Sequence, residues 1–117
     1  MKKLYHLSTC DTCKRIITEL NLPSDVVLQD IKVEAITATQ LEEMYALSGS
    51  YEALFSKRAR LYKEKDLKNA SLTEDDYKSY ILEHYTFLKR PVLIYNDQVF
   101  IGNSKKTVAS AKDYIHA

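Results

Sequence analysis

The two cysteines of the chain, Cys10 and Cys13, lie where a short apolar segment gives way to a helical pattern. Residues 3–7 are compatible with a β-strand, and a polar turn leads from them into a helix expected over residues 12–20. A sulfur at the start of a helix meets unpaired N–H groups and the positive end of the helix dipole, which stabilise a thiolate over a thiol. The spacing therefore predicts a reactive Cys10 with a second thiol close to it.

A second strand is expected in the β-branched run Val26–Ile31, which is continuous enough to be buried on both faces of a sheet. A strand, a helix and a strand within about thirty residues form a β-α-β unit, which implies parallel strands joined by a right-handed crossover. Capping-box patterns at Thr39–Glu42 and Ser71–Glu74 then predict helices. The middle of the chain is therefore expected to be helical.

A hairpin followed by a helix is predicted in the C-terminal part of the chain. Two apolar runs, Pro91–Tyr95 and Gln98–Ile101, flank the turn-forming pair Asn96-Asp97. The helix that follows has an apolar inner face, formed by Val108, Ala111, Tyr114 and Ile115.

This order of elements is β-α-β, a helical insertion, then β-β-α. Together with a Cys-x-x-Cys motif at the first strand-to-helix turn, it is the arrangement of the thioredoxin-like fold. We expect an α/β protein with a mixed four-stranded sheet. Residues 1–117 are expected to form a single domain, with the helical insertion at about residues 35–86.

The charge balance narrows the classes of partner. Seventeen basic and sixteen acidic residues give a net charge of +1, so no overall field favours nucleic acid or a membrane surface. The basic run Lys57–Lys65 has the composition of an RNA contact, but Glu64 and Asp66 lie in or beside it, which favours a solvated helix end. We expect no direct binding of nucleic acid. One arginine of this run is a candidate to close over the thiol site.

The expected location is the cytoplasm. No apolar stretch approaches the ~20 residues of a membrane span, and the N-terminal segment reaches His6 too soon for a secretory signal. In a reducing compartment, two cysteines are better interpreted as a reduced or cycling pair than as a structural disulfide.

The Cys-x-x-Cys spacing allows two kinds of chemistry. In the first, Cys10 attacks a substrate and Cys13 resolves the product as an intramolecular disulfide. In the second, the pair forms half of a zinc site, but this needs two more ligands, and no histidine pair has the required spacing. The redox interpretation is favoured, and no metal is expected.

Two further residues are candidates for the same site. His6, four residues before Cys10, can lower the pKa of the thiol as a cation or hydrogen-bond donor, or it can simply face its neighbours in the strand. Pro91 is a candidate for a cis peptide bond that brings Arg90 beside Cys10, where the guanidinium suits an oxyanion or a thiolate. The alternative is a surface arginine at the start of a strand.

These features together resemble the ArsC/Spx/YffB family, which includes arsenate reductases, Spx-type transcription regulators and uncharacterised relatives. The resemblance runs from about Lys3 to Ile115. It rests on Tyr5-His6 before Cys10, the segment Leu54–Arg58, the pair Glu83-His84, and Arg90-Pro91 before a hairpin that ends at Ile101-Gly102.

The resemblance implies a function and site roles. Cys10 is the nucleophile, His6 lowers its pKa, Cys13 takes part in the redox cycle, and Arg90 binds and activates an oxyanion. Arg58 and Thr12 are further candidates for binding the substrate. The function implied is that of an arsenate reductase-like thiol-disulfide oxidoreductase acting on a small oxyanion or a disulfide. No bound cofactor is expected, with glutathione as co-substrate and glutaredoxin or thioredoxin as partner.

Two of the three arginines of the arsenate reductases have no counterpart here, since Ser56 and Gly102 occupy those positions. The Spx and YffB branch likewise carries an arginine near Arg58 and a glycine near Gly102. The chain reaches Ala117 soon after the last predicted helix, which resembles YffB more than the longer Spx proteins. The alternative function is an Spx-like redox sensor that binds the C-terminal domain of the RNA polymerase α-subunit. A third option is a domain that keeps the fold without redox function.

Overall fold

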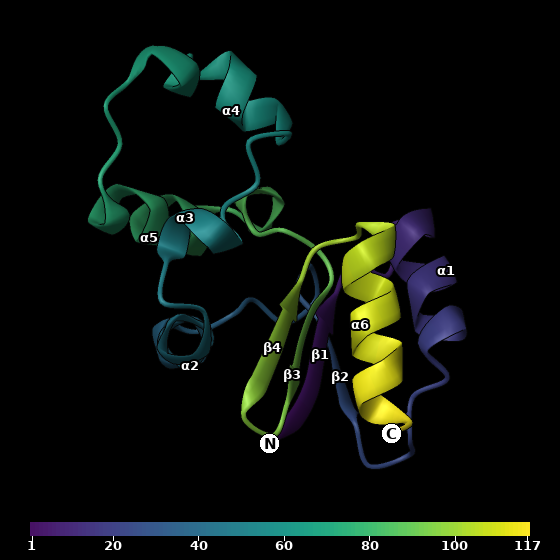
Figure 1. Cartoon of the computed structure of the whole chain (residues 1–117). Coiled ribbons are helices and arrows are strands. Elements are labelled where there is room, and N and C mark those ends of the chain that lie inside the picture. Colours follow the sequence, from purple (N-terminus) through teal and green to yellow (C-terminus); the bar gives the residue numbers. More distant parts are fainter. The chain divides into compact units, whose positions relative to one another are not determined.

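The four-stranded sheet is built from both ends of the sequence. The computed structural model, which describes residues 1–117, places the strands in the order β2-β1-β3-β4. Strand β1 (Lys2–His6) pairs parallel to β2 (Val27–Asp30) and antiparallel to β3 (Val92–Tyr95). Strand β3 pairs antiparallel to β4 (Gln98–Ile101). The mixed four-stranded sheet, together with the helices that accompany it, confirms the predicted α/β fold class (Figure 1).

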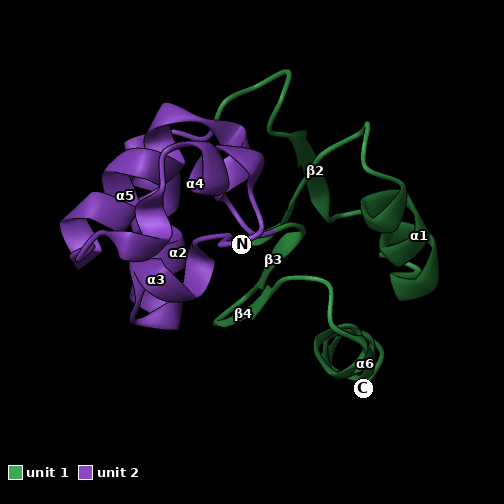
Figure 2. Cartoon of the chain, turned by 90° about the horizontal axis from the view of Figure 1, so that it is seen from above, with its two compact units in different colours: residues 1–35, 90–117 green, residues 36–89 purple.

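The chain divides into two compact units, which Figure 2 colours separately. Unit 1, residues 1–35 and 90–117, holds the sheet with the helices α1 (Asp11–Leu20) and α6 (Lys105–Ile115). Unit 2, residues 36–89, is helical. Its elements are α2 (Ala38–Ser48), α3 (Tyr51–Leu54), α4 (Arg60–Glu64), α5 (Glu74–Glu83) and the short 3-10 helices η1 (Leu67–Asn69) and η2 (Tyr85–Phe87). That the whole chain is a single domain stays a prediction.

Helices α1 and α6 pack on one face of the sheet in unit 1 (Figure 1). Leu4 of β1 and Leu93 of β3 form a buried cluster with apolar residues of the two helices, namely Ile16, Leu20, Val108 and Ala111. Tyr114 and Ile115 pack against this cluster and are partly buried. The predicted inner face of the last helix is therefore confirmed.

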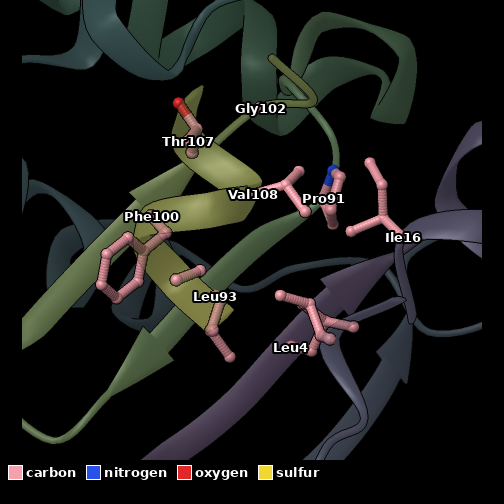
Figure 3. Close-up of a pocket in the computed structure, with 10 residues that line it drawn as sticks. Leu4, Ile16, Pro91, Leu93, Phe100, Gly102, Thr107 and Val108 are labelled. Atoms are coloured by element: carbon pink, nitrogen blue, oxygen red, sulfur yellow. The ribbon is translucent and has the colours of Figure 1, made fainter. Parts of the chain in front are cut away.

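A small cavity lies within this core, between the sheet and the two helices (Figure 3). Its volume is about 10 Å³, roughly the space that one water molecule needs. Most of the side chains around it are apolar, including Leu4, Phe100 and Val108. A cavity of this size and character belongs to the packing of the core and is too small for a substrate.

Strand β2 lies at the edge of the sheet, so the expectation that it is buried on both faces is wrong. Val27 and Leu28 are 58% and 48% exposed, and only Gln29 of this strand is buried. The β-branched run predicts the strand correctly but carries no information on its place in the sheet. Because β1 occupies the position between β2 and β3, β2 has a neighbour on one side only.

Helices α2 and α5 of unit 2 begin at capping boxes that differ from the predicted ones. Thr37 caps α2 by accepting a hydrogen bond from the backbone N–H of Gln40, whose side chain accepts one from Thr37 in return. Thr73 and Asp76 form the same arrangement at the start of α5. In both cases a second Thr or Ser lies two residues from the true cap, so the motif fixes the start of the helix only approximately.

The core of unit 2 is aromatic. The ring of Phe55 stacks on that of Phe87, with 5.3 Å between the centroids, and lies 4.9 Å from that of Tyr77. The carboxylate of Glu74 in α5 accepts hydrogen bonds of 2.8 and 3.0 Å from the backbone N–H groups of Tyr51 and Glu52, which links α5 to the start of α3.

The longest helices of the protein, α2 and α6, have 11 residues each. No helix combines the length and apolar character that crossing a bilayer requires.

Candidate functional site

Cys10 is the N-cap residue of α1 and is partly exposed. Its backbone is extended, its N–H donates a 3.0 Å hydrogen bond to the carbonyl of Leu7, and its carbonyl accepts one from Lys14. The first of these bonds closes a tight turn through Ser8 and Thr9, so the sulfur is held where the chain passes from strand into helix. The predicted position of the thiol at a helix start is confirmed.

The surroundings of Cys10 favour the thiolate. Partial burial alone would raise the pKa of Cys10, but the backbone N–H and the thiol of Cys13, the backbone N–H of Thr12 and the charge of Arg90 together lower it below its ordinary value. Cys10 makes no side-chain capping hydrogen bond of the kind that serine or threonine makes at an N-cap. The amides act on its sulfur more weakly than such a bond would. Cys10 therefore has the exposure and the electrostatics of a nucleophile.

Cys13 has the opposite character. Its side chain is fully buried, and this burial raises its pKa to about 11, with further contributions from the charge of Cys10 and from a hydrogen bond to Cys10. The backbone N–H of Leu7 and the charge of Arg90 oppose the shift without cancelling it. Both cysteines are free thiols that lie near each other. Cys10 is therefore the more acidic thiol of the pair, and Cys13 stays protonated at neutral pH and can donate a hydrogen bond to it.

Arg90 belongs to the same unit and lies near both thiols. Its charge is among the causes that lower the pKa of Cys10 and of Cys13, and its side chain is half-buried. The peptide bond between Arg90 and Pro91 is cis, as predicted. The structure therefore brings together Cys10, Cys13 and Arg90, while the role of Arg90 toward a substrate stays a prediction.

The other predicted site residues are placed as follows. Thr12 contributes its backbone N–H to the environment of Cys10, and its side chain is half-exposed. His6 ends β1 opposite Asp30 of β2, and its charge is among the causes that lower the pKa of Asp30. Arg58 lies exposed in the turn before α4 of unit 2. The functional roles of these three residues stay predictions.

Sequence reasoning missed the aspartate that contacts the cysteine turn. Asp30 is the last residue of β2, and its carboxylate accepts hydrogen bonds from the backbone N–H and the hydroxyl of Ser8. One signal was available, because the carboxyl ends of two parallel neighbouring strands meet at the same edge of a sheet. Applied to the expected β-α-β unit, this rule places the residue that ends β2 beside the turn that follows β1.

We predict that Cys10 is alkylated selectively. Because the pKa of Cys10 is lowered and that of Cys13 is raised to about 11, iodoacetamide at neutral pH should modify Cys10 faster than free cysteine and leave Cys13 unmodified. Mass spectrometry of the modified protein between about pH 5 and pH 10 gives the rate at each site. A Cys10 rate no higher than that of free cysteine at neutral pH would show that the helix start does not activate the thiol.

No group of three or more His, Cys, Asp or Glu side chains in the structure is arranged to hold a metal ion. The two cysteines interact with each other and with the start of α1 rather than with a histidine. The site as built is a thiol pair at a helix start with an arginine beside it.

Comparison with known proteins agrees with this architecture. The protein YfgD of Escherichia coli (strain K12), described as uncharacterized, is 24% identical over 110 residues, covering 91% of this chain and 92% of that protein. The solved structure of a YFFB protein has a TM-score of 0.76 at 22% identity, covering 95% of this chain and 98% of its own. An arsenate reductase from Vibrio cholerae has a TM-score of 0.78 at 21% identity, covering 94% and 96%. This chain therefore has the thioredoxin-like fold of these structures.

The sequence profile of the ArsC family matches residues 5–111. The match includes the end of the strand before Cys10, both cysteines and Arg90, and it extends into the last helix. Because it covers nearly the whole chain, this protein is a member of the ArsC family.

Proposed function

We propose that this protein is a thiol-disulfide oxidoreductase in which Cys10 is the attacking thiol. The observation that carries the proposal is the opposite character of two neighbouring thiols, one partly exposed with a lowered pKa and one buried with a raised pKa. Such a pair supplies a nucleophile and a protonated second thiol in the same place.

In the first step the Cys10 thiolate attacks one sulfur of a disulfide substrate. A sulfur–sulfur bond forms between Cys10 and that half of the substrate, the original disulfide bond breaks, and the other half leaves as a thiolate that takes a proton from solvent. The substrate is thereby reduced at one sulfur, and Cys10 is oxidised. The lowered pKa of Cys10 raises the fraction of thiolate available for this attack.

The second step uses Cys13. Two causes that raise its pKa, the charge of Cys10 and the hydrogen bond to it, are lost once Cys10 is held in a mixed disulfide. Cys13 then releases its proton more readily and attacks the Cys10 sulfur, and the second half of the substrate leaves and takes up a proton. The Cys10–Cys13 disulfide that results is reduced by two thiols of the glutathione class, which end as a disulfide, or by glutaredoxin or thioredoxin.

A small oxyanion such as arsenate is a second substrate class for the same thiol, in line with the name of the Vibrio cholerae structure. Arg90 supplies one guanidinium fork beside Cys10 for such an anion. Arsenate reduction also consumes two electrons, which Cys10 and one further thiol provide. Ser56 and Gly102 occupy the positions of the other two arginines of the arsenate reductases, so a multiply charged oxyanion meets fewer donors here, which favours disulfide substrates.

The test is a coupled assay that follows NADPH oxidation with glutathione, glutathione reductase and glutaredoxin. Small mixed disulfides and arsenate are offered in turn to the full chain. We expect turnover of a mixed disulfide that exceeds turnover of arsenate. Protein that oxidises no NADPH with any of these substrates would contradict the proposal.

A second candidate function uses the same thiol pair as a switch. Since Cys13 donates a hydrogen bond to Cys10, the pair is positioned to close as a disulfide in response to an oxidant. A redox sensor of the Spx type would bind the C-terminal domain of the RNA polymerase α-subunit differently in its two states. Pull-down with the purified domain in reductant and in oxidant separates the two functions, because a sensor binds without turnover and an oxidoreductase turns over without binding.

A further inference from the structure

The carboxylate of Asp30, at the carboxyl end of β2, accepts three hydrogen bonds. Its Oδ1 accepts hydrogen bonds from the backbone N–H groups of Ser8 (3.4 Å) and Lys32 (3.1 Å), and its Oδ2 accepts one from the hydroxyl of Ser8. The hydroxyl of Ser8, the backbone donors and the charge of His6 keep the pKa of Asp30 below its ordinary value, although desolvation opposes them. Asp30 is therefore ionised at neutral pH.

The turn that Asp30 contacts is bonded to both thiols. Its first residue, Leu7, accepts the hydrogen bond from the backbone N–H of Cys10, and the N–H of Leu7 interacts with the sulfur of Cys13. Ser8, the residue that follows Leu7, makes both hydrogen bonds of the turn to Asp30. A shift of this turn would therefore move the N-cap sulfur relative to the amides that stabilise its charge.

We propose that Asp30 is a positioning residue that fixes the turn before Cys10 and thereby keeps the sulfur of Cys10 over the backbone N–H groups at the start of α1. The inference rests on the proposed function, for which Cys10 is the nucleophile. Asp30 acts through Ser8 and does not touch the substrate.

The charge of Asp30 and its hydrogen bonds have opposite effects on the pKa of Cys10. A carboxylate near Cys10 disfavours a second negative charge, so its field alone raises the pKa of the thiol. If Asp30 assists Cys10, it does so through its hydrogen bonds and in spite of its charge. This opposition allows the two effects to be separated by substitution.

Asp30→Asn and Asp30→Ala remove the same charge but differ in hydrogen bonding. Asparagine keeps Oδ1 as acceptor for the backbone N–H groups of Ser8 and Lys32, and its amide can donate to the Ser8 hydroxyl, whereas alanine keeps none of these bonds. We expect Asp30→Asn to be alkylated at Cys10 as fast as wild type or faster. Asp30→Ala should be alkylated about 3- to 10-fold more slowly than Asp30→Asn at neutral pH, with the pH midpoint of the reaction moved upward.

The matched control is Asp25→Ala, which removes an aspartate from the opposite end of β2, where its carboxylate pairs with the Lys2 ammonium at 2.9 Å. This variant should match wild type in the alkylation rate and in its pH midpoint. If Asp30→Ala does not fold, Ser8→Ala removes one donor from the same contact and should slow alkylation about 2-fold. The upward shift of the pH midpoint is the result that a merely stabilising role of Asp30 would not produce.

Equal alkylation rates in Asp30→Asn and Asp30→Ala would overturn the inference, as would an equal loss in Asp25→Ala. For the Ser8 variant, an unchanged rate would do so. Alkylation requires no substrate, so this result is independent of turnover in the NADPH assay. A wild-type protein without turnover would contradict the proposed function and leave the comparison of the Asp30 variants valid.

Discussion

Cys10→Ser is expected to reduce turnover of disulfide and oxyanion substrates to below about one thousandth of the wild-type value, because the nucleophile of the first step is lost. A serine hydroxyl at the same N-cap remains protonated at neutral pH, whereas the lowered pKa of Cys10 raises the fraction of thiolate. The initial rate in the coupled NADPH assay measures the effect. Thermal unfolding should be close to that of wild type, since serine is a favourable N-cap residue.

Cys13→Ser is the matched control, since it makes the same substitution one helical turn further on. The serine hydroxyl can still donate a hydrogen bond to the Cys10 sulfur, so the first step should persist and a mixed disulfide on Cys10 should accumulate when no external thiol is present. Mass spectrometry detects that adduct directly. Turnover that survives in Cys10→Ser, or no adduct on Cys10 in Cys13→Ser, would contradict the assigned order of attack.

The elements that the sequence predicts correctly are those with local signals. The β-α-β unit follows from a strand, a helix and a second strand in immediate succession, and the hairpin follows from Asn96-Asp97 between two apolar runs. Asn96 has a φ of 58°, a left-handed conformation that asparagine tolerates and that this kind of turn requires. The edge position of β2 could not be predicted in this way, because strand order depends on pairings between distant segments.

The same distinction applies to the site. The exposure of Cys10 and the burial of Cys13 follow from their positions in one turn of α1, which the spacing in the sequence already specifies. The contact between Asp30 and Ser8 joins residues 22 positions apart and depends on the parallel register in which His6 lies opposite Asp30. The sequence allows this register but does not select it.

Arg90→Ala is expected to lower kcat/KM for an oxyanion substrate by about 10- to 100-fold, because a guanidinium beside the thiol is lost as a charged donor. The charge of Arg90 is also among the causes that lower the pKa of Cys10, so its removal should shift the pH midpoint of Cys10 alkylation upward. A neutral disulfide makes no use of the guanidinium fork. The loss for that substrate should therefore be smaller and should follow the change in thiolate content alone.

Arg90→Lys distinguishes the two contributions of Arg90. The lysine ammonium keeps a positive charge near Cys10 but lacks the planar fork, so Cys10 alkylation should stay close to wild type while oxyanion turnover falls. Arg15→Ala, which removes an exposed arginine from α1 of the same unit, should leave both measurements unchanged because solvent and salt screen its charge. An Arg90→Lys variant with wild-type oxyanion turnover would mean that the fork does not bind the substrate. If Arg90→Ala is alkylated at the wild-type rate, its charge does not stabilise the Cys10 thiolate.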